Sequence, residues 1–112
     1  MSHPFVFMDL RTTDRDRSRS FYGELFGWAA TESLFTGAEG PWGGLTHLTP
    51  DDDRQPQWVP YAPVDDLDKA LARAVELGAT ATRPRVDLPQ GSVAVIEDPT
   101  GATLALWQPT QA

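Results

Sequence analysis

The stretch Asp65-Asp66-Leu67-Asp68-Lys69-Ala70-Leu71-Ala72-Arg73-Ala74-Val75-Glu76-Leu77-Gly78 has the clearest periodicity in the chain. Its apolar residues recur at the i, i+3, i+4, i+7, i+8 spacing that places them on one side of a helix: Leu67, Ala70, Leu71, Ala74 and Val75. Asp65 or Asp66 can cap the first turn, and Gly78 can end the last one. The stretch therefore predicts an amphipathic helix.

Strand signals surround this helix. The pattern predicts one strand before it, at 58–64, and three after it, at 79–86, 92–96 and 103–107. The first half has the same order, with an aromatic strand at 5–10 and a helix that begins after Thr13 or Asp14 and ends at Gly27. An apolar stripe on that helix is expected from Phe21, Tyr22, Leu25 and Phe26. Weaker strand signals follow at 28–35 and 42–49.

The two halves align as an internal repeat. Gly27 corresponds to Gly78, and the segment 43–48 corresponds to 101–106. The interval between these landmarks is 16 positions in the first half and 23 in the second. The difference is about one strand with its turn, so one strand of the first half should be lost or badly shortened. We expect a single domain over 1–112, with module one at 1–50, a linker at 51–57 and module two at 58–112.

Composition narrows the classes of function. The chain has 112 residues, a formal net charge of -7 and no cysteine. These features disfavour a nucleic-acid binder and exclude disulfides, thiolate catalysis and zinc–thiolate sites. The N-terminus lacks the pattern of a signal peptide, and no apolar run is long enough for a membrane helix. We therefore expect a cytoplasmic protein with neither a nucleic-acid nor a membrane partner.

Several motifs together resemble the vicinal oxygen chelate superfamily, which includes glyoxalase I, extradiol dioxygenases and bleomycin-resistance proteins. The motifs lie at 13–14, 20–28, 64–70, 76–79, 98–102 and 106–109, in the same order as in the family. The resemblance implies an α+β fold in which two βαβββ modules in tandem form a cupped mixed sheet with helices outside. It is closest to the small glyoxalase-like and bleomycin-resistance-like proteins. A homodimer is also implied.

The resemblance also gives positions for the four metal ligands found in metal-dependent members. They fall on Phe7, on His47, on Trp58 or Val59, and on Ala105. Only His47 among these can donate a lone pair to a divalent ion, and a single histidine does not hold one. We therefore expect neither a metal nor another cofactor.

The candidate site residues lie on predicted strands, and all of them except Trp58, which stays undecided, have the side-chain parity that points into the expected cup. His47 and Asp9 are candidates for acid/base catalysis, although His47 can equally be structural and Asp9 can simply pair with Arg11. The candidates for ligand binding are Phe7, Trp58, Val59, Tyr61, Ala105 and Trp107. Tyr61 and Trp107 would supply stacking walls for a flat molecule.

Three functions remain open from the sequence. The leading hypothesis is a protein that binds a small flat or cationic molecule without a metal. The second is an isomerase, cyclase or lyase, either metal-independent or metal-dependent if the ligand register differs. The third is a non-catalytic scaffold domain.

Overall fold

The structure, a computed structural model, describes residues 4–52 and 54–110. The chain forms two compact units, and the boundary between them falls between Val59 and Pro60. We call the unit Phe7–Val59 the N-terminal unit. The C-terminal unit contains residues 60–110 and also residues 4–6, where the Val6 amide donates to the Tyr61 carbonyl at 2.9 Å. Among the described residues, no helix is long and apolar enough to cross a membrane.

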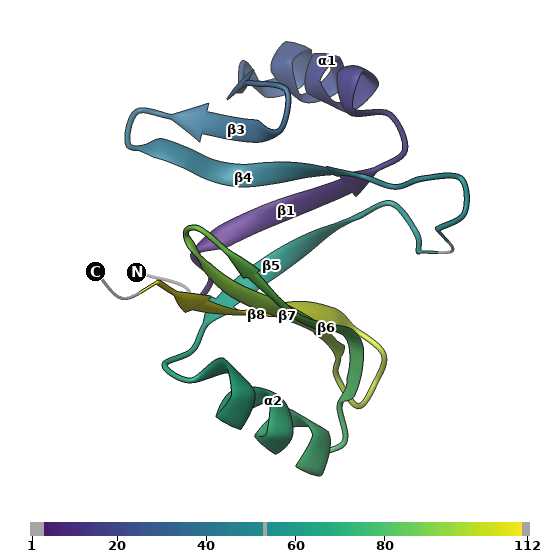
Figure 1. Cartoon of the computed structure of the whole chain (residues 1–112). Coiled ribbons are helices and arrows are strands. Elements are labelled where there is room, and N and C mark those ends of the chain that lie inside the picture. The colour runs from purple at the N-terminus through teal and green to yellow at the C-terminus, as the bar shows by residue number, and fades with distance from the viewer. Residues whose placement is uncertain (1–3, 53, 111–112) are drawn as a thin grey trace. The chain divides into compact units, whose positions relative to one another are not determined.

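The N-terminal unit contains one helix and a small sheet. Its elements are β1 (Phe7–Thr12), α1 (Arg15–Phe26), β2 (Ala29–Ala30), β3 (Leu34–Gly37) and β4 (Gly40–His47). The strand order is β2-β3-β4-β1, with β1 parallel to β4 and the other pairs antiparallel. Figure 1 shows β3, β4 and β1 in this order. Strand β1 begins two residues later than expected, and the single strand expected at 28–35 is divided into β2 and β3.

The C-terminal unit repeats this order. Its elements are β5 (Gln57–Pro63), which crosses the boundary between the units, α2 (Leu67–Glu76), β6 (Thr80–Leu88), β7 (Gly91–Glu97) and β8 (Thr103–Pro109). The strand order is β5-β8-β7-β6, with β5 parallel to β8. Strand β6 has nine residues where β2 has two, which confirms the shortened strand of the first half. The expected α+β fold of two tandem βαβββ modules is also confirmed.

Both helices begin where the sequence predicts. The Asp14 carboxylate accepts a hydrogen bond from the Arg17 amide at 3.0 Å, and the Asp66 carboxylate accepts one from the Lys69 amide at 3.1 Å. These caps satisfy amides that have no partner inside the first turn of a helix. Gly27 ends α1 with a φ of 75°, a left-handed conformation that glycine adopts without a steric penalty.

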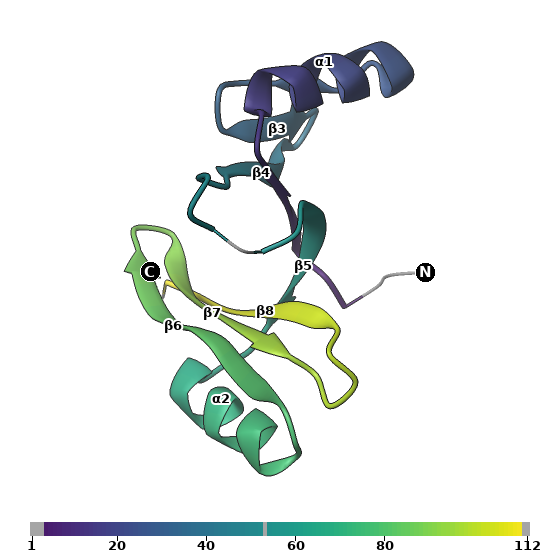
Figure 2. The ribbon, with the colours of Figure 1, turned by 90° about the vertical axis from the view of Figure 1, so that its right-hand side faces the viewer.

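The C-terminal core confirms the apolar stripe of α2 at four of its five residues; the fifth, Val75, is 50% exposed, so the prediction was wrong there. Leu67 is fully buried with Ala94, Ile96 and Leu106, and Ala70, Leu71 and Ala74 pack against this cluster. In both views α2 lies beside the strands β6 to β8 (Figures 1 and 2). Leu104 and Leu106 of β8 therefore face α2.

The N-terminal core differs from the expected one. Leu10, Phe35 and Leu45 are buried, and the side chains packed against them are mostly aromatic: Tyr22, Trp28, Ala30, Trp42 and Trp58. Only Tyr22 of the expected α1 stripe belongs to this cluster, whereas Phe21, Leu25 and Phe26 are each more than half exposed. The stripe prediction was wrong for these three residues because tryptophans from outside the helix fill the space beside Tyr22 and Phe35.

Candidate functional site

The register of β1 and β4 determines which side chains face α1 and which project from the other face of the sheet. Leu10 pairs with Leu45, and both pack in the core beneath α1. Because side chains alternate along a strand, Asp9 and Arg11 project from the other face, together with their partners Gly44 and Thr46. We call these four residues, with Phe7, the polar face of the N-terminal unit. Phe7 and Asp9 therefore share one face, as the sequence parity predicts.

Asp9 is a buried carboxyl group on the polar face. It is 6% exposed, and the Thr46 hydroxyl lies 3.0 Å from its Oδ1 and 2.8 Å from its Oδ2. Burial raises the pKa of the Asp9 carboxyl above its ordinary value. The Thr46 hydrogen bond and the positive charges of Arg11 and Arg54 oppose this rise. Asp9 therefore combines burial with a raised pKa.

Gly44 makes room for the Asp9 carboxylate. A Cβ atom at position 44 would lie 2.5 Å from Asp9 Oδ1 and 3.2 Å from Cε2 of Phe7. Any side chain there would displace both groups from the backbone of β4. Glycine at this position therefore lets the carboxylate and the aromatic ring lie directly against the sheet.

His47 is not part of the polar face. It pairs with Thr12 at the end of β4, and Leu45, two residues earlier, faces α1. Alternation places His47 on the side of α1, so the expectation that it shares a face with Phe7 and Asp9 was wrong. The alignment of the two halves was out of register at this point, and a displacement by an odd number of residues moves a side chain to the opposite face. Gly44 and Thr46 are the residues of β4 that occupy the face assigned to His47.

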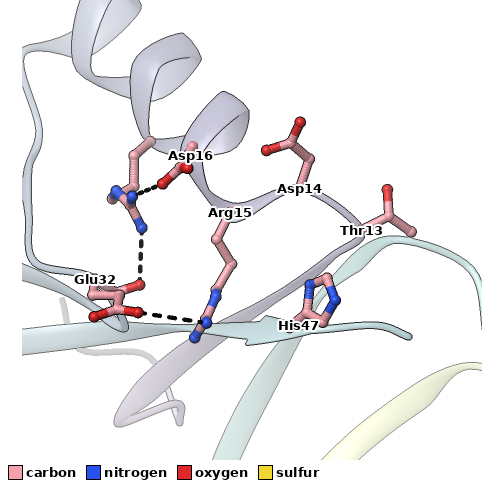
Figure 3. Close-up of a pocket in the computed structure, with 7 residues that line it drawn as sticks. Thr13, Asp14, Arg15, Asp16, Glu32 and His47 are labelled. Atoms are coloured by element: carbon pink, nitrogen blue, oxygen red, sulfur yellow. Dashed lines mark hydrogen bonds and ion pairs between the residues drawn. The ribbon is translucent and has the colours of Figure 1, made fainter. Parts of the chain in front are cut away.

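His47 instead lines a polar pocket of about 260 Å³ near the beginning of α1 (Figure 3). The other lining residues are Thr13, Asp14, Arg15, Asp16, Arg19 and Glu32. Most charged side chains of this pocket pair with one another. Asp16 forms an ion pair with Arg19, and the Arg15 Nη2 atom lies 3.9 Å from Glu32 Oε1. Asp14 is occupied as the cap of α1. The pocket therefore leaves little charge for a ligand, and His47 and Asp9 do not form a joint acid/base pair.

The structure separates Trp58 from its neighbour Val59. The Trp58 Nε1–H group donates to the Tyr22 hydroxyl at 3.0 Å, so its indole belongs to the aromatic core beside α1. Trp58 therefore does not share the face of Val59, and its role in ligand binding stays a prediction. Val59 is fully buried and projects from the opposite side of the strand.

In the C-terminal unit, three candidates share one face. Tyr61 pairs with Ala105 across β5 and β8, and Trp107 lies two residues beyond Ala105. The Tyr61 and Trp107 rings are 5.8 Å apart with an interplanar angle of 43°. Leu104 and Leu106 face α2, so these three side chains lie on the opposite side of the sheet. Tyr61 and Trp107 are partly exposed, whereas Ala105 is fully buried. We call Tyr61 and Trp107 the aromatic face.

Gly91 has the same relation to the aromatic face as Gly44 has to the polar face. A Cβ atom at position 91 would lie 2.7 Å from Cζ2 and 2.9 Å from Cη2 of Trp107. It would also lie 2.5 Å from the Gln108 carbonyl oxygen. The Trp107 indole therefore extends across the backbone of β7 where no side chain stands.

The side chains at the expected metal positions do not fit a divalent ion. Phe7, Val59 and Ala105 carry no donor atom, and Gly44 and Thr46, the residues of β4 on the same face as Phe7, offer only the neutral hydroxyl of Thr46. Within residues 4–52 and 54–110, no three His, Asp or Glu side chains gather closely enough to hold a metal ion.

Sequence reasoning missed Gly44, Thr46 and Arg54. Arg54 follows β4 in the segment before β5, and its Nε–H group donates to Asp52 Oδ1 at 2.7 Å. Strand alternation counted from Asp9 would identify Gly44 and Thr46 once the register of β1 and β4 is known. No local sequence signal indicates that Arg54 acts on Asp9.

Solved structures show the same fold. The methylmalonyl-CoA epimerase of Streptomyces coelicolor matches with a TM-score of 0.63 and 11% identity, over 99% of this chain and 100% of that chain. At this level of identity, the match shows the fold alone.

Two curated relatives are closer in sequence. The Mycobacterium bovis protein named "Putative glyoxylase CFP32" is 30% identical over 91% of this chain and 44% of its own length. The anthracycline biosynthesis protein DauV of Streptomyces sp. strain C5 is 32% identical over 86% of this chain and 38% of its own length. The chain thus spans less than half the length of these two relatives.

The family model of the Glyoxalase/Bleomycin resistance protein/Dioxygenase superfamily matches residues 3–106, which is nearly the whole chain. This match agrees with the tandem βαβββ modules and with the motifs in both halves. The chain therefore belongs to the glyoxalase, bleomycin resistance protein and dioxygenase superfamily.

Proposed function

We propose that this chain binds a small, flat organic molecule on the aromatic face of the C-terminal unit, without using a metal ion. The observation that carries this proposal is the pair of partly exposed rings, Tyr61 and Trp107, on the side of the sheet away from α2. Two aromatic rings held in this way offer apolar area and stacking surface at a low cost in side-chain entropy. The position of Trp107 across Gly91 supports the proposal, because the missing side chain leaves room for the indole against the backbone of β7.

The relatives and the net charge suggest the chemical class of the ligand. DauV is named for anthracycline biosynthesis, and anthracyclines contain fused planar rings. The formal charge of -7 favours a cationic ligand over an anionic one. A flat cation is therefore the first probe to test. A cytoplasmic location stays a prediction.

The experiment titrates the protein with 9-aminoacridine, a flat cation, and with anthraquinone-2-sulfonate, a flat anion, by calorimetry. We expect Trp107→Ala and Tyr61→Ala each to weaken binding of 9-aminoacridine about tenfold, or by about 1.4 kcal/mol, through lost stacking. Phe21→Ala on α1 serves as the control, because Phe21 is an exposed ring outside the proposed site. The proposal is wrong if the two variants bind as the unchanged protein does, or if Phe21→Ala has an equal effect. Elemental analysis of the same samples checks that binding proceeds without a bound metal.

A second candidate function rests on Asp9. A buried carboxyl group with a raised pKa is suited to proton transfer, which favours an isomerase or lyase that uses Asp9 on the polar face. Deuterium exchange next to the carbonyl of dihydroxyacetone, followed by NMR in D₂O, tests this chemistry. Exchange that is lost in Asp9→Asn would support the enzyme. If exchange does not exceed the background rate but a ligand binds on the aromatic face, the enzyme hypothesis is wrong and the binding function stands. If neither binding nor exchange is seen, the scaffold hypothesis takes precedence.

A further inference from the structure

Glu97 is a partly buried carboxylate at the end of β7. Within residues 4–52 and 54–110, its side chain makes no hydrogen bond and no ion pair. The next residue, Asp98, differs, because its Oδ1 atom accepts hydrogen bonds from the Thr100 hydroxyl at 2.8 Å and from the Ala102 amide at 3.1 Å. A carboxylate that is partly withdrawn from water gains from a donor or a positive charge beside it. Glu97 is therefore a candidate contact for a cation.

Glu97 projects from the same side of the C-terminal sheet as the aromatic face. Its neighbour Ile96 packs in the core with Leu67 of α2. Because side chains alternate along a strand, Glu97 points to the other side, which is the side that carries Tyr61 and Trp107. A molecule bound on the aromatic face therefore lies on the same surface as this carboxylate.

The strand register gives the separation between the rings and the carboxylate. Tyr61 pairs with Ala105 across β5 and β8. Ala105 in turn pairs with Val95 of β7, two residues before Glu97. Two strand spacings across the sheet and two residues along β7 place the Cα atoms of Tyr61 and Glu97 about 12 Å apart. A ring system stacked on Tyr61 would therefore reach Glu97 only through an arm of several atoms.

We propose that Glu97 is the residue that selects the ligand of the aromatic face, and that it favours a planar ring system with an ammonium group at the end of a short flexible arm. This inference rests on the proposed binding function. The rings stack on Tyr61 and Trp107, and the arm crosses β8 and β7 to the Glu97 carboxylate. The net charge of the chain favours cations in general, whereas Glu97 gives the positive charge a defined position on the ligand.

Arg83 is the alternative contact for such an arm. It pairs with Val95 across β6 and β7, so it projects from the same side of the sheet as Glu97. An arm that ends in a carboxylate would meet Arg83 in place of Glu97. We choose the ammonium group because Glu97 is partly buried whereas Arg83 is exposed, and because a formal charge of -7 disfavours an anion.

The test titrates three acridines that share one ring system and differ at the end of the arm. They are 9-(butylamino)acridine, 9-(4-aminobutylamino)acridine and 4-(acridin-9-ylamino)butanoic acid. By calorimetry, the amine-ended compound should bind about fivefold more tightly than the butyl compound, which is the upper range for an ion pair near the surface. Glu97→Gln should remove this advantage and leave the affinity for the butyl compound unchanged.

Glu76→Gln is the matched control for the change in net charge. It makes the same substitution at an exposed carboxylate on α2, away from the aromatic face, and should leave all three affinities unchanged. Circular dichroism confirms that each variant is folded. An advantage of the amine-ended compound that survives Glu97→Gln, or that Glu76→Gln reduces equally, overturns the proposal. Tighter binding of the acid-ended compound also overturns it.

Trp107→Ala separates this inference from the proposed function. It should weaken all three compounds, because it removes the stacking surface that they share. If Trp107→Ala changes none of the affinities, the proposed function is wrong and the role of Glu97 is overturned with it. If Trp107→Ala weakens all three compounds while Glu97→Gln has no selective effect, binding on the aromatic face stands and only the role of Glu97 is overturned.

Discussion

Gly44→Ala tests how closely the Asp9 carboxylate lies against β4. The added Cβ would stand 2.5 Å from Asp9 Oδ1, whereas a carbon–oxygen contact needs about 3.3 Å, so the carboxylate must move by about 0.8 Å. That shift would stretch hydrogen bonds of 3.0 and 2.8 Å to Thr46 close to or beyond their limit. Overpacking costs about 1–3 kcal/mol, and leaving the buried carboxylate without its partner costs about 1–3 kcal/mol. Alanine recovers about 0.5–1 kcal/mol by restricting the unfolded chain. We expect a net loss of about 2–4 kcal/mol.

Urea unfolding followed by tryptophan fluorescence measures this loss. The matched control is Gly37→Ala, where the nearest atom to the added Cβ is Cδ1 of Trp42 at an ordinary distance of 3.5 Å. Gly37→Ala should leave the free energy of unfolding unchanged or slightly raised. In an Asp9→Ala background, the effect of Gly44→Ala should shrink by about 1–2 kcal/mol, because the oxygen that the methyl group meets is gone. A Gly44→Ala variant as stable as the unchanged protein would refute the reasoning, as would an equal loss in both backgrounds.

Two further predictions concern the N-terminal unit. Phe35→Ala should lower the free energy of unfolding by about 3–5 kcal/mol, because Phe35 is fully buried among aromatic side chains; a loss below about 1 kcal/mol in thermal unfolding would contradict this packing. Asp9→Asn should flatten the pH dependence of stability. Because the pKa of Asp9 is raised above 3.8 in the folded state, that state holds the proton more tightly than the unfolded state does. The free energy of unfolding should therefore fall as pH rises from about 3.8 through the folded pKa, and Asp9→Asn should be at least as stable as the unchanged protein at pH 7. Urea titrations at several pH values check this, and a variant with the same pH profile as the unchanged protein would show that burial does not dominate at Asp9.

The second half of the fold was more predictable than the first for a physical reason. The apolar residues at helical spacing in α2, such as Leu67, Leu71 and Ala74, are the ones that pack against the sheet. The periodicity of the sequence therefore predicts which side of this helix is buried. Tyr22 of α1 instead contacts Trp28, Phe35 and Trp58, which lie outside the helix, and local periodicity cannot reveal such contacts. Phe21 and Leu25 therefore resemble core residues in the sequence but lie outside.

The candidate site was predictable where strand alternation alone decides. Phe7 and Asp9 lie on one strand, and so do Ala105 and Trp107, so parity places each pair on a common face. The assignment of His47 instead depended on aligning two halves of unequal length. Strands β3 and β4 contain a register irregularity at Phe35 and Thr36, and strand pairing of this kind is not visible in the sequence. Arg54 could not be found for a related reason, because its closeness to Asp9 arises only in the folded chain.

The unequal lengths of β2 and β6 also bear on how the chain avoids aggregation. Both are edge strands, so each has a sheet neighbour on one side only and leaves the backbone amides and carbonyls of its other side without a strand partner. With two residues, β2 is too short to template another strand. Strand β6 has nine residues, but it contains Pro84, two register irregularities, and Arg85, which forms ion pairs with Asp68 and Asp87. Proline, bulges and fixed charges all oppose pairing with a second chain. We therefore expect replacement of Pro84 or Arg85 to affect aggregation of the protein more than the stability of its fold.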